Sequence, residues 1–121
     1  MLAVGATALG QASSQTRNAP SRLQQVPDCT GVESWPTAMA FVFLKNAGLT
    51  DNDKLDFTKT KTVRIASEEV KRGVFKQVHH VTFIEKSAAK IEVITVNDAS
   101  RQECSEGPVD VYVISKHLGP I

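Results

Sequence analysis

Three histidines are the side chains of this sequence best suited to metal binding or proton transfer near neutral pH: His79, His80 and His117. Adjacent residues of a strand point to opposite faces of a sheet, so His79 and His80 could act together only if a β-bulge turned one ring. The chain has neither the HxH spacing nor the HExxH helix of zinc enzymes. We therefore interpret these histidines as surface or half-buried strand residues. A small periplasmic hydrolase or metal-binding protein that uses them is the alternative hypothesis.

Other reactive side chains lack the neighbours that catalysis requires. The aspartates between positions 51 and 56 superficially resemble a calcium loop, but the turn glycine and the distal glutamate are absent, so we interpret them as loop and cap residues. Ser100 and Ser105 have no nucleophile elbow or glycine-rich oxyanion segment around them. No glycine-rich loop could hold a phosphate group. The sequence therefore predicts no catalytic residue and no cofactor.

The two cysteines, Cys29 and Cys104, lie far apart in the chain, and neither belongs to a CxxC or Cys/His metal motif. Such a pair in an exported protein is most simply a disulfide. In the chain-entropy model, closing so long a loop stabilises the folded state by about 4 to 5 kcal/mol. We predict a Cys29–Cys104 disulfide, with buried free thiols or one reactive thiol as the alternatives.

The beginning of the chain has the features of an export signal. Residues 1–12 are small or apolar and uncharged, and Gly10-Gln11-Ala12 has the small residues that signal peptidase requires. The first cation is Arg17, so the basic region that opens a complete signal is missing. We predict a signal-peptide remnant over residues 1–12, a flexible leader over residues 13–27, and one α+β domain over residues 28–121. No apolar run reaches the roughly 18 residues of a transmembrane segment.

Composition and charge favour an ordinary globular protein. Hydrophobic residues make up 41% of the chain and charged residues 22%. Fourteen lysines and arginines against thirteen acidic residues give a net charge of +1, which offers no global field for nucleic acid. Cations do gather between positions 54 and 76, but acidic residues interrupt them, so we expect a solvated face. The expected partner is another protein or a second copy of this chain.

One strong helix is predicted over residues 35–49. Ser34 can cap it, Pro36 suits its first turn and Gly48 can end it. Its body is apolar on nearly every side, so a sheet can bury only one face, and the N-terminal segment, a loop or a second protein must cover another. The candidate partner-binding residues are the large aromatic side chains of this helix: Trp35, Phe41 and Phe43. A Trp at a helix start is more often a core anchor than a binding residue, and an exposed ring would reverse that interpretation.

The rest of the chain predicts strands over residues 59–66, 74–85, 90–97 and 108–115. Lysines near position 60 suit an edge strand. The last two strands are apolar on both faces, so they suit the interior of the sheet or a position covered on both sides. The apolar residues of 74–85 change parity, which predicts a bulge near His79 and His80. Residues 67–73 fit either a helical turn or a hairpin loop, and residues 98–103 fit a short helix.

These elements predict an α+β fold. We expect a four-stranded, mostly antiparallel sheet with one main helix packed on a face, plus one or two short helical turns.

The C-terminal third resembles a group of exported proteins. The residues that carry the resemblance are Val96-Asn97-Asp98-Ala99-Ser100, Glu103-Cys104-Ser105 and the run 111–119, and the likeness extends over residues 78–83. They resemble small uncharacterised exported proteins of Gram-negative proteobacteria, a group with no established activity. The resemblance implies a periplasmic or secreted location and supplies no catalytic residues. The leading functional hypothesis is a non-enzymatic binding or interaction module outside the cytoplasm.

Overall fold

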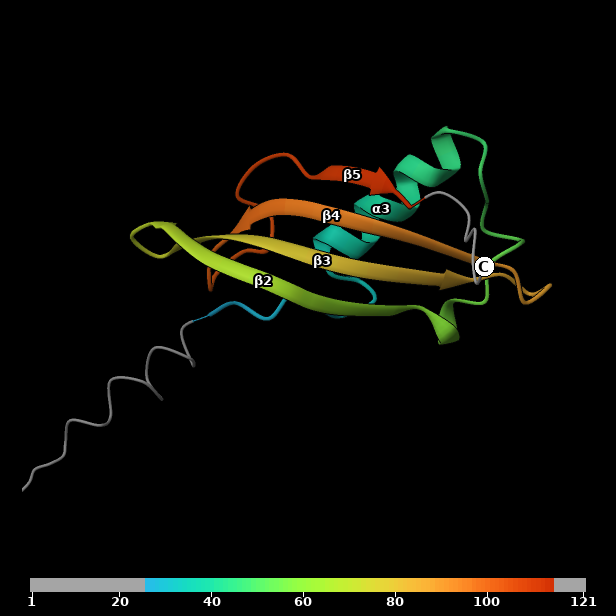
Figure 1. Cartoon of the computed structure of the whole chain (residues 1–121), viewed down its shortest axis with the longest axis horizontal. Coiled ribbons are helices and arrows are strands. Elements are labelled where there is room, and N and C mark those ends of the chain that lie inside the picture. Colours follow the sequence, from blue (N-terminus) through green and yellow to red (C-terminus); the bar gives the residue numbers. More distant parts are fainter. Residues whose placement is uncertain (1–25, 115–121) are drawn as a thin grey trace, which may run out of the picture.

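The fold is built on an antiparallel sheet with one helix on one of its faces (Figure 1). The computed structural model describes residues 26–114. Its elements are, in chain order, α3 (Trp35–Asn46), the 3-10 turn η2 (Phe57–Lys59), β2 (Lys61–Lys71), β3 (Val74–Ile84), β4 (Lys90–Ala99) and β5 (Asp110–Val113). Each strand pairs with the next one in the chain, so the sheet order is β2-β3-β4-β5. The predicted α+β class is confirmed.

The start of the described part is built into the fold. Pro27, the last residue of the predicted leader, is buried, and its carbonyl accepts hydrogen bonds from two side chains of the sheet. The predicted signal remnant and residues 13–25 of the leader lie outside the described residues, as does His117.

Helix α3 begins and ends for identifiable reasons. Ser34 occupies the N-cap position, although its side chain makes no capping hydrogen bond, and Pro36 lies in the first turn. At the other end Gly48 adopts a φ of 76°, and the N–H of Leu49 donates to the carbonyl of Leu44 at 2.9 Å. This wrapped ending needs a residue that tolerates the left-handed conformation, so the glycine ends the helix as predicted.

The apolar core lies between the helix and the centre of the sheet. Its buried members come from the helix, the loop after it and the two central strands: Ala40, Leu44, Leu55, Val81, Phe83 and Val93. Phe41, Ile91 and Val111 pack around them. The sheet covers one side of the helix, as predicted. Cover of its other side by a further segment or a second protein stays a prediction, because Val42 and Phe43 are 39% and 41% exposed.

The predicted bulge in the second strand is wrong. β3 pairs with β4 without a register shift, and the shifts lie on β2, between Arg64 and Ala66 and again near its end. The odd-numbered residues of β3 are all buried, and these include the polar Gln77 and His79. The apolar residues change parity because one end of the covered face is polar, not because the strand contains an extra residue.

The connections differ from the sequence expectations at two places. Of the two options for residues 67–73, the hairpin is correct and the helical turn is wrong, but the loop is shorter than expected: β2 runs to Lys71 and meets Val74 across a two-residue turn. Gly73, with a φ of 75°, supplies the left-handed residue of this turn. The predicted helix over residues 98–103 is also wrong: β4 continues to Ala99 and irregular turns follow, held by two hydrogen bonds between the backbones of Ser100 and Glu103.

The strand positions confirm one edge and correct the other. β2, with its lysines, is an edge strand as predicted. β5 was expected inside the sheet or covered on both sides, but it is the opposite edge, because the chain supplies no fifth strand within residues 26–114. No described element covers the sheet face away from the helix (Figure 1). Val63 and Tyr112, which pair with His80 and Ile94 on that face, are 41% and 58% exposed.

Candidate binding site beside the helix

An apolar pocket of about 440 Å³ opens between α3, η2 and the sheet. Its lining comes from the turn before the helix, the helix itself, η2 and β3: Val32, Glu33, Thr37, Ala38, Phe41, Val42, Phe57 and Phe83. This volume lies within the range of sites that accept a small apolar molecule or a large side chain. The pocket therefore has the size and chemistry of a binding site.

Three phenylalanines form the inner surface of the pocket. The ring of Phe41 meets that of Phe57 edge to face, with 5.1 Å between the ring centroids, and lies 6.4 Å from that of Phe83. Phe83 is buried on β3 and belongs to the core, whereas Phe57 is 38% exposed. The site thus has a fixed floor and an exposed aromatic wall, a geometry that favours contact with another apolar group.

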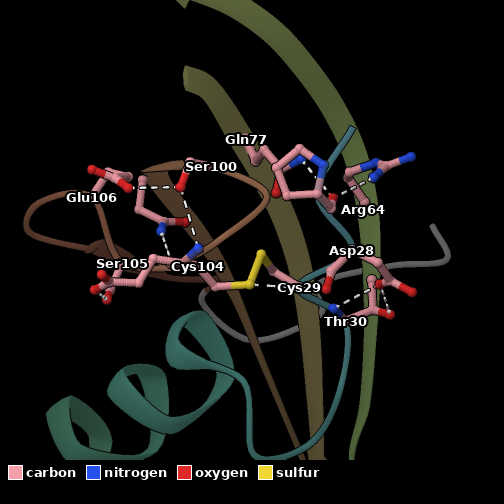
Figure 2. The surroundings of a disulfide bond; sticks show 12 residues. Asp28, Cys29, Thr30, Arg64, Gln77, Ser100, Cys104, Ser105 and Glu106 are labelled. Atoms are coloured by element: carbon pink, nitrogen blue, oxygen red, sulfur yellow. Dashed lines mark hydrogen bonds between the residues drawn. A yellow bond between two sulfur atoms is a disulfide. The ribbon is translucent and has the colours of Figure 1, made fainter. Parts of the chain in front are cut away.

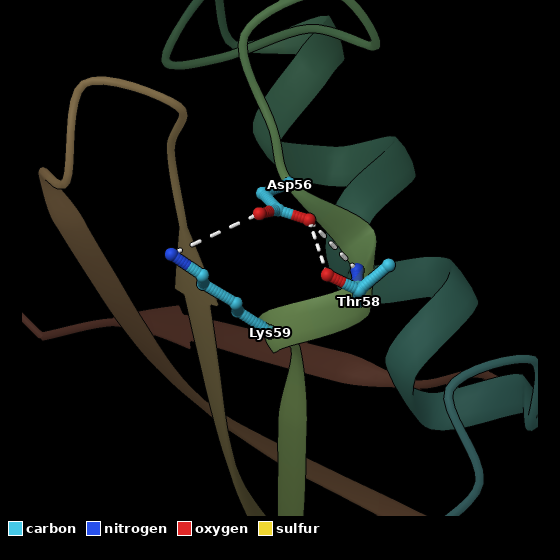
Figure 3. A network of polar contacts seen from close by, with 3 residues as sticks. All are labelled: Asp56, Thr58 and Lys59. Atoms are coloured by element: carbon cyan, nitrogen blue, oxygen red, sulfur yellow. Dashed lines mark hydrogen bonds and ion pairs between the residues drawn. The ribbon is translucent and has the colours of Figure 1, made fainter.

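Polar contacts of η2 hold the Phe57 wall in place. The carboxylate of Asp56 accepts hydrogen bonds from the backbone N–H and the hydroxyl of Thr58, and Lys59 lies 3.9 Å from its other oxygen (Figure 3). The N–H of Asp56 donates to the carbonyl of Ile84 at 2.9 Å, which ties the turn to the end of β3. The hydroxyl bond from Thr58 lowers the pKa of Asp56, so the cap is charged at neutral pH. The prediction that this aspartate is a cap residue is confirmed.

Only one charged side chain lines the pocket. The hydroxyl of Thr37 is already paired with that of Thr62 at 2.6 Å, which also joins the helix to the edge strand. Glu33 is exposed at the mouth and is the only ionisable group among the lining residues. An occupant would therefore meet apolar walls and a single negative charge.

The outward face of the helix extends the apolar surface beyond the pocket. Trp35 and Phe43, two of the predicted partner-binding residues, are 43% and 41% exposed, and Val42 between them is 39% exposed. Phe41, the third predicted residue, is turned into the pocket instead. Sequence reasoning missed Phe57 and Val32. The Asp-Phe-Thr sequence at positions 56–58, which can cap a short turn, is the signal that could have located Phe57.

The structure separates the two histidines that it describes. His79 was expected at the surface or half-buried, and this is wrong: it is fully buried on the helix side of β3, because one end of that covered face is polar. His80 lies on the other face, where its Nε2 is 2.8 Å from a carboxylate oxygen of Glu92. Within residues 26–114 no group of three His, Cys, Asp or Glu side chains could hold a metal ion. Burial lowers the pKa of His79, and nearby Arg64 lowers it further, against a smaller opposing effect of Asp28.

The basic stretch between positions 54 and 76 is partly neutralised by its surroundings. Lys59 and Lys76 lie 3.9 and 3.3 Å from aspartate oxygens, of Asp56 and Asp98. Arg64 donates to the carbonyl of Pro27 rather than facing a ligand. These contacts agree with the expectation of a solvated face.

The predicted disulfide between Cys29 and Cys104 is confirmed (Figure 2). It joins residues separated by 75 positions and attaches the first described segment to the loop after β4. Such a bond indicates an oxidising compartment. In this loop the hydroxyl of Ser100 donates to Glu106 at 2.7 Å, so Ser100 is occupied in holding a turn. None of the helices within residues 26–114 has the length and apolar character needed to cross a membrane.

No protein-family model, no curated protein and no solved structure matches this chain.

Proposed function

We propose that this protein is an exported, non-enzymatic binding module, periplasmic or secreted, whose pocket beside α3 receives a large apolar side chain of a partner polypeptide. The lining of the pocket is the observation that carries the proposal: three phenylalanine rings and two valines face a space of about 440 Å³ beside a single carboxylate. The disulfide supports the location, because such bonds persist in oxidising compartments.

The surroundings of the pocket favour a polypeptide over a small molecule. A small apolar ligand would fill the pocket and leave the rings of Trp35 and Phe43, both about two-fifths exposed, in water. A polypeptide segment can place one side chain in the pocket and lay its neighbours along the helix, as amphipathic partners do in other recognition grooves. Burial of aromatic anchors of this kind dominates the energetics of protein interfaces.

The negative charge of Glu33 at the pocket opening indicates which charge the partner should carry. Glu33 is the only ionisable lining residue, and α3 has no acidic side chain in its first turn and one basic residue, Lys45, in its last. A partner with a lysine or arginine beside the apolar side chain would place opposite charges together at the mouth. We therefore expect an apolar side chain that has a basic neighbour.

The first test fills the pocket. Ala38→Leu adds a branched side chain to the lining, and Asn46→Leu adds the same side chain at an exposed position of the same helix. The neutral fluorophore N-phenyl-1-naphthylamine, followed by its emission, should bind the wild type and Asn46→Leu alike. Its Kd should rise at least about tenfold in Ala38→Leu. Equal binding to all three proteins would show that the pocket does not take apolar groups.

The second measurement identifies the preferred occupant. Three short peptides that differ at two adjacent positions, Leu-Lys, Ser-Lys and Leu-Glu, compete with the fluorophore. The Leu-Lys peptide should displace it best, because it alone combines an apolar side chain with a charge opposite to Glu33. If the Leu-Lys peptide fails to compete while the fluorophore binds, the pocket takes small molecules and the polypeptide proposal is wrong.

A hydrolase or metal-binding protein is not favoured by any observation within residues 26–114. That alternative used His79, His80, His117 or an unpaired Cys104. The rings of His79 and His80 lie on opposite faces of β3, Cys104 is in the disulfide, and His117 lies outside the described residues.

A further inference from the structure

Four polar side chains are buried together on the helix side of the sheet, at the end away from the apolar core. They form two cross-strand pairs, Gln77 with Asn97 and His79 with Thr95. Their exposed fractions are 0% for three of them and 3% for Asn97. We call these four residues the polar quartet.

Much of the hydrogen-bonding capacity of the polar quartet has no partner among the described residues. The atoms concerned are Gln77 Oε1, His79 Nδ1, His79 Nε2, Thr95 Oγ1 and Asn97 Oδ1. A buried polar atom without a partner destabilises the state that buries it, because water would hydrogen-bond to that atom once exposed. Covering the polar quartet therefore lowers the stability of the folded state.

Residues 26–30, which we call the strap, cover this end of the sheet. Pro27 and Cys29 are buried and the intervening Asp28 is exposed, as expected for an extended segment with one side against the sheet. The hydroxyl and N–H of Thr30 both donate to Asp28 and keep the pKa of that carboxyl low, so Asp28 stays charged in solvent.

Few bonds attach the strap to the sheet. Gln77 Nε2 and Arg64 Nη1 both donate to the carbonyl of Pro27, at 3.0 and 2.9 Å. Within residues 26–114, the backbone hydrogen bonds outside helices and strand ladders include none from residues 26–30 to the sheet. The remaining link is the Cys29–Cys104 disulfide. Asn97 Nδ2 donates to the carbonyl of Cys104 at 2.7 Å and so attaches the Cys104 end of this bond to β4.

We propose that the strap is a redox-released cover: reduction of the Cys29–Cys104 disulfide frees residues 26–30 from the sheet and exposes the polar quartet while the rest of the fold persists. The chain beyond the strap stays in place because Ser34 bonds to Gly31 and begins the helix, so the hinge lies at Gly31. Opening exposes polar atoms that gain hydrogen bonds to water, rather than the apolar core around Phe83 and Val93.

The reductant is a dithiol. One of its sulfurs attacks a sulfur of the protein disulfide, and a mixed disulfide forms as the other cysteine leaves as a thiolate. The second thiol of the reductant then displaces the first cysteine, and the thiolates take up protons. The protein gains two electrons and two protons, and the dithiol becomes a disulfide.

The experiment compares deuterium exchange at the ring C2–H of the two adjacent histidines. His79 is buried under the strap, whereas the side chain of His80 is 34% exposed on the opposite face and serves as the internal control. Dithiothreitol, or the double variant Cys29→Ser/Cys104→Ser, should accelerate exchange at His79 at least about tenfold and leave His80 unchanged. Reoxidation of the wild type should restore slow exchange at His79.

Backbone amide exchange in the same samples reports on the sheet. Loss of the cross-link lowers global stability, so amides of Val81 and Val93, in the paired centre of β3 and β4, should exchange faster after reduction but remain far slower than in the unfolded chain. An unchanged His79 rate, or exchange at Val81 and Val93 as fast as in the unfolded chain, would overturn the proposal.

A second variant tests the cover without breaking the disulfide. Gln77→Met removes one of the two donors to Pro27 at nearly constant volume, and the cross-link keeps the fold intact. Exchange at His79 should rise several-fold in this oxidised variant, and no change in exchange would contradict the role assigned to the strap.

Discussion

Burial of a single residue, His79, makes the stability of the folded state depend on pH. Its ring is fully buried, and no described residue bonds to either nitrogen. Arg64 and Asp28 are the charged groups near it, and Thr95 faces it from β4. Because burial and Arg64 both disfavour the imidazolium, the pKa of His79 in the folded state lies below the value of 6.5 that it has in the unfolded chain.

Below pH 6.5 the unfolded chain takes up a proton on this residue more readily than the folded protein does. The stability contributed by neutral His79 is therefore complete above pH 6.5 and is lost as the pH falls toward the folded pKa. Urea unfolding between about pH 7 and pH 5 should show this loss, and His79→Leu should reduce it. His80→Gln, on the opposite face, should retain it. A wild type with equal stability across this range would contradict the assignment.

At the scale of elements, the connection between β3 and β4 contains the one described non-glycine residue with a positive φ. Ala88 has a φ of 77°, in a turn closed by a hydrogen bond from its N–H to the carbonyl of Glu85 at 2.7 Å. The left-handed conformation disfavours alanine by roughly 1 to 2 kcal/mol, whereas glycine adopts it freely. Residues 87–89 contain neither Gly nor Asn, and Ala88 takes the left-handed position that those two residue types favour.

Ala88→Gly should therefore raise the free energy of unfolding by about 0.5 to 1 kcal/mol, after the greater flexibility of the unfolded chain is subtracted. Ala89→Gly, one position later, removes no such strain and should lower it slightly. Thermal unfolding followed by circular dichroism measures both. A destabilised Ala88→Gly would mean that the turn does not adopt this conformation in solution.

The sequence patterns predicted the positions of the helix and strands well, but they misjudged which side chains are buried. The end of α3 was predictable because Gly48 carries a local signal. The course of β3 was misread because Gln77 and His79 are polar side chains in buried positions, and a rule that matches apolar residues to the covered face cannot anticipate them. Phe41 was identified on the helix, but the pocket also needs Phe57 and Phe83, which only the tertiary fold brings beside it.

At the scale of the whole molecule, one covalent bond joins two segments that lie outside the sheet. The Cys29–Cys104 disulfide spans 75 positions, and in the chain-entropy model it restricts the unfolded chain strongly. Cys29→Ala/Cys104→Ala should lower the free energy of unfolding by about 4 kcal/mol. Urea unfolding should also show a larger slope m, because the unfolded chain without the cross-link exposes more surface. A midpoint equal to that of the wild type would show that the bond does not stabilise the fold.

The strand order has a consequence for how the molecule forms. Because β2, β3, β4 and β5 each pair with the next strand in the chain, most sheet contacts join residues close in sequence, and such topologies fold quickly. The segments that carry Cys29 and Cys104 bond to Gln77 and Asn97, through Pro27 and Cys104 respectively. Gln77 and Asn97 lie opposite each other only after β3 and β4 have paired. We therefore expect the disulfide to form after β3 and β4 have paired, so that oxidation stabilises chains whose strands are already in the correct register.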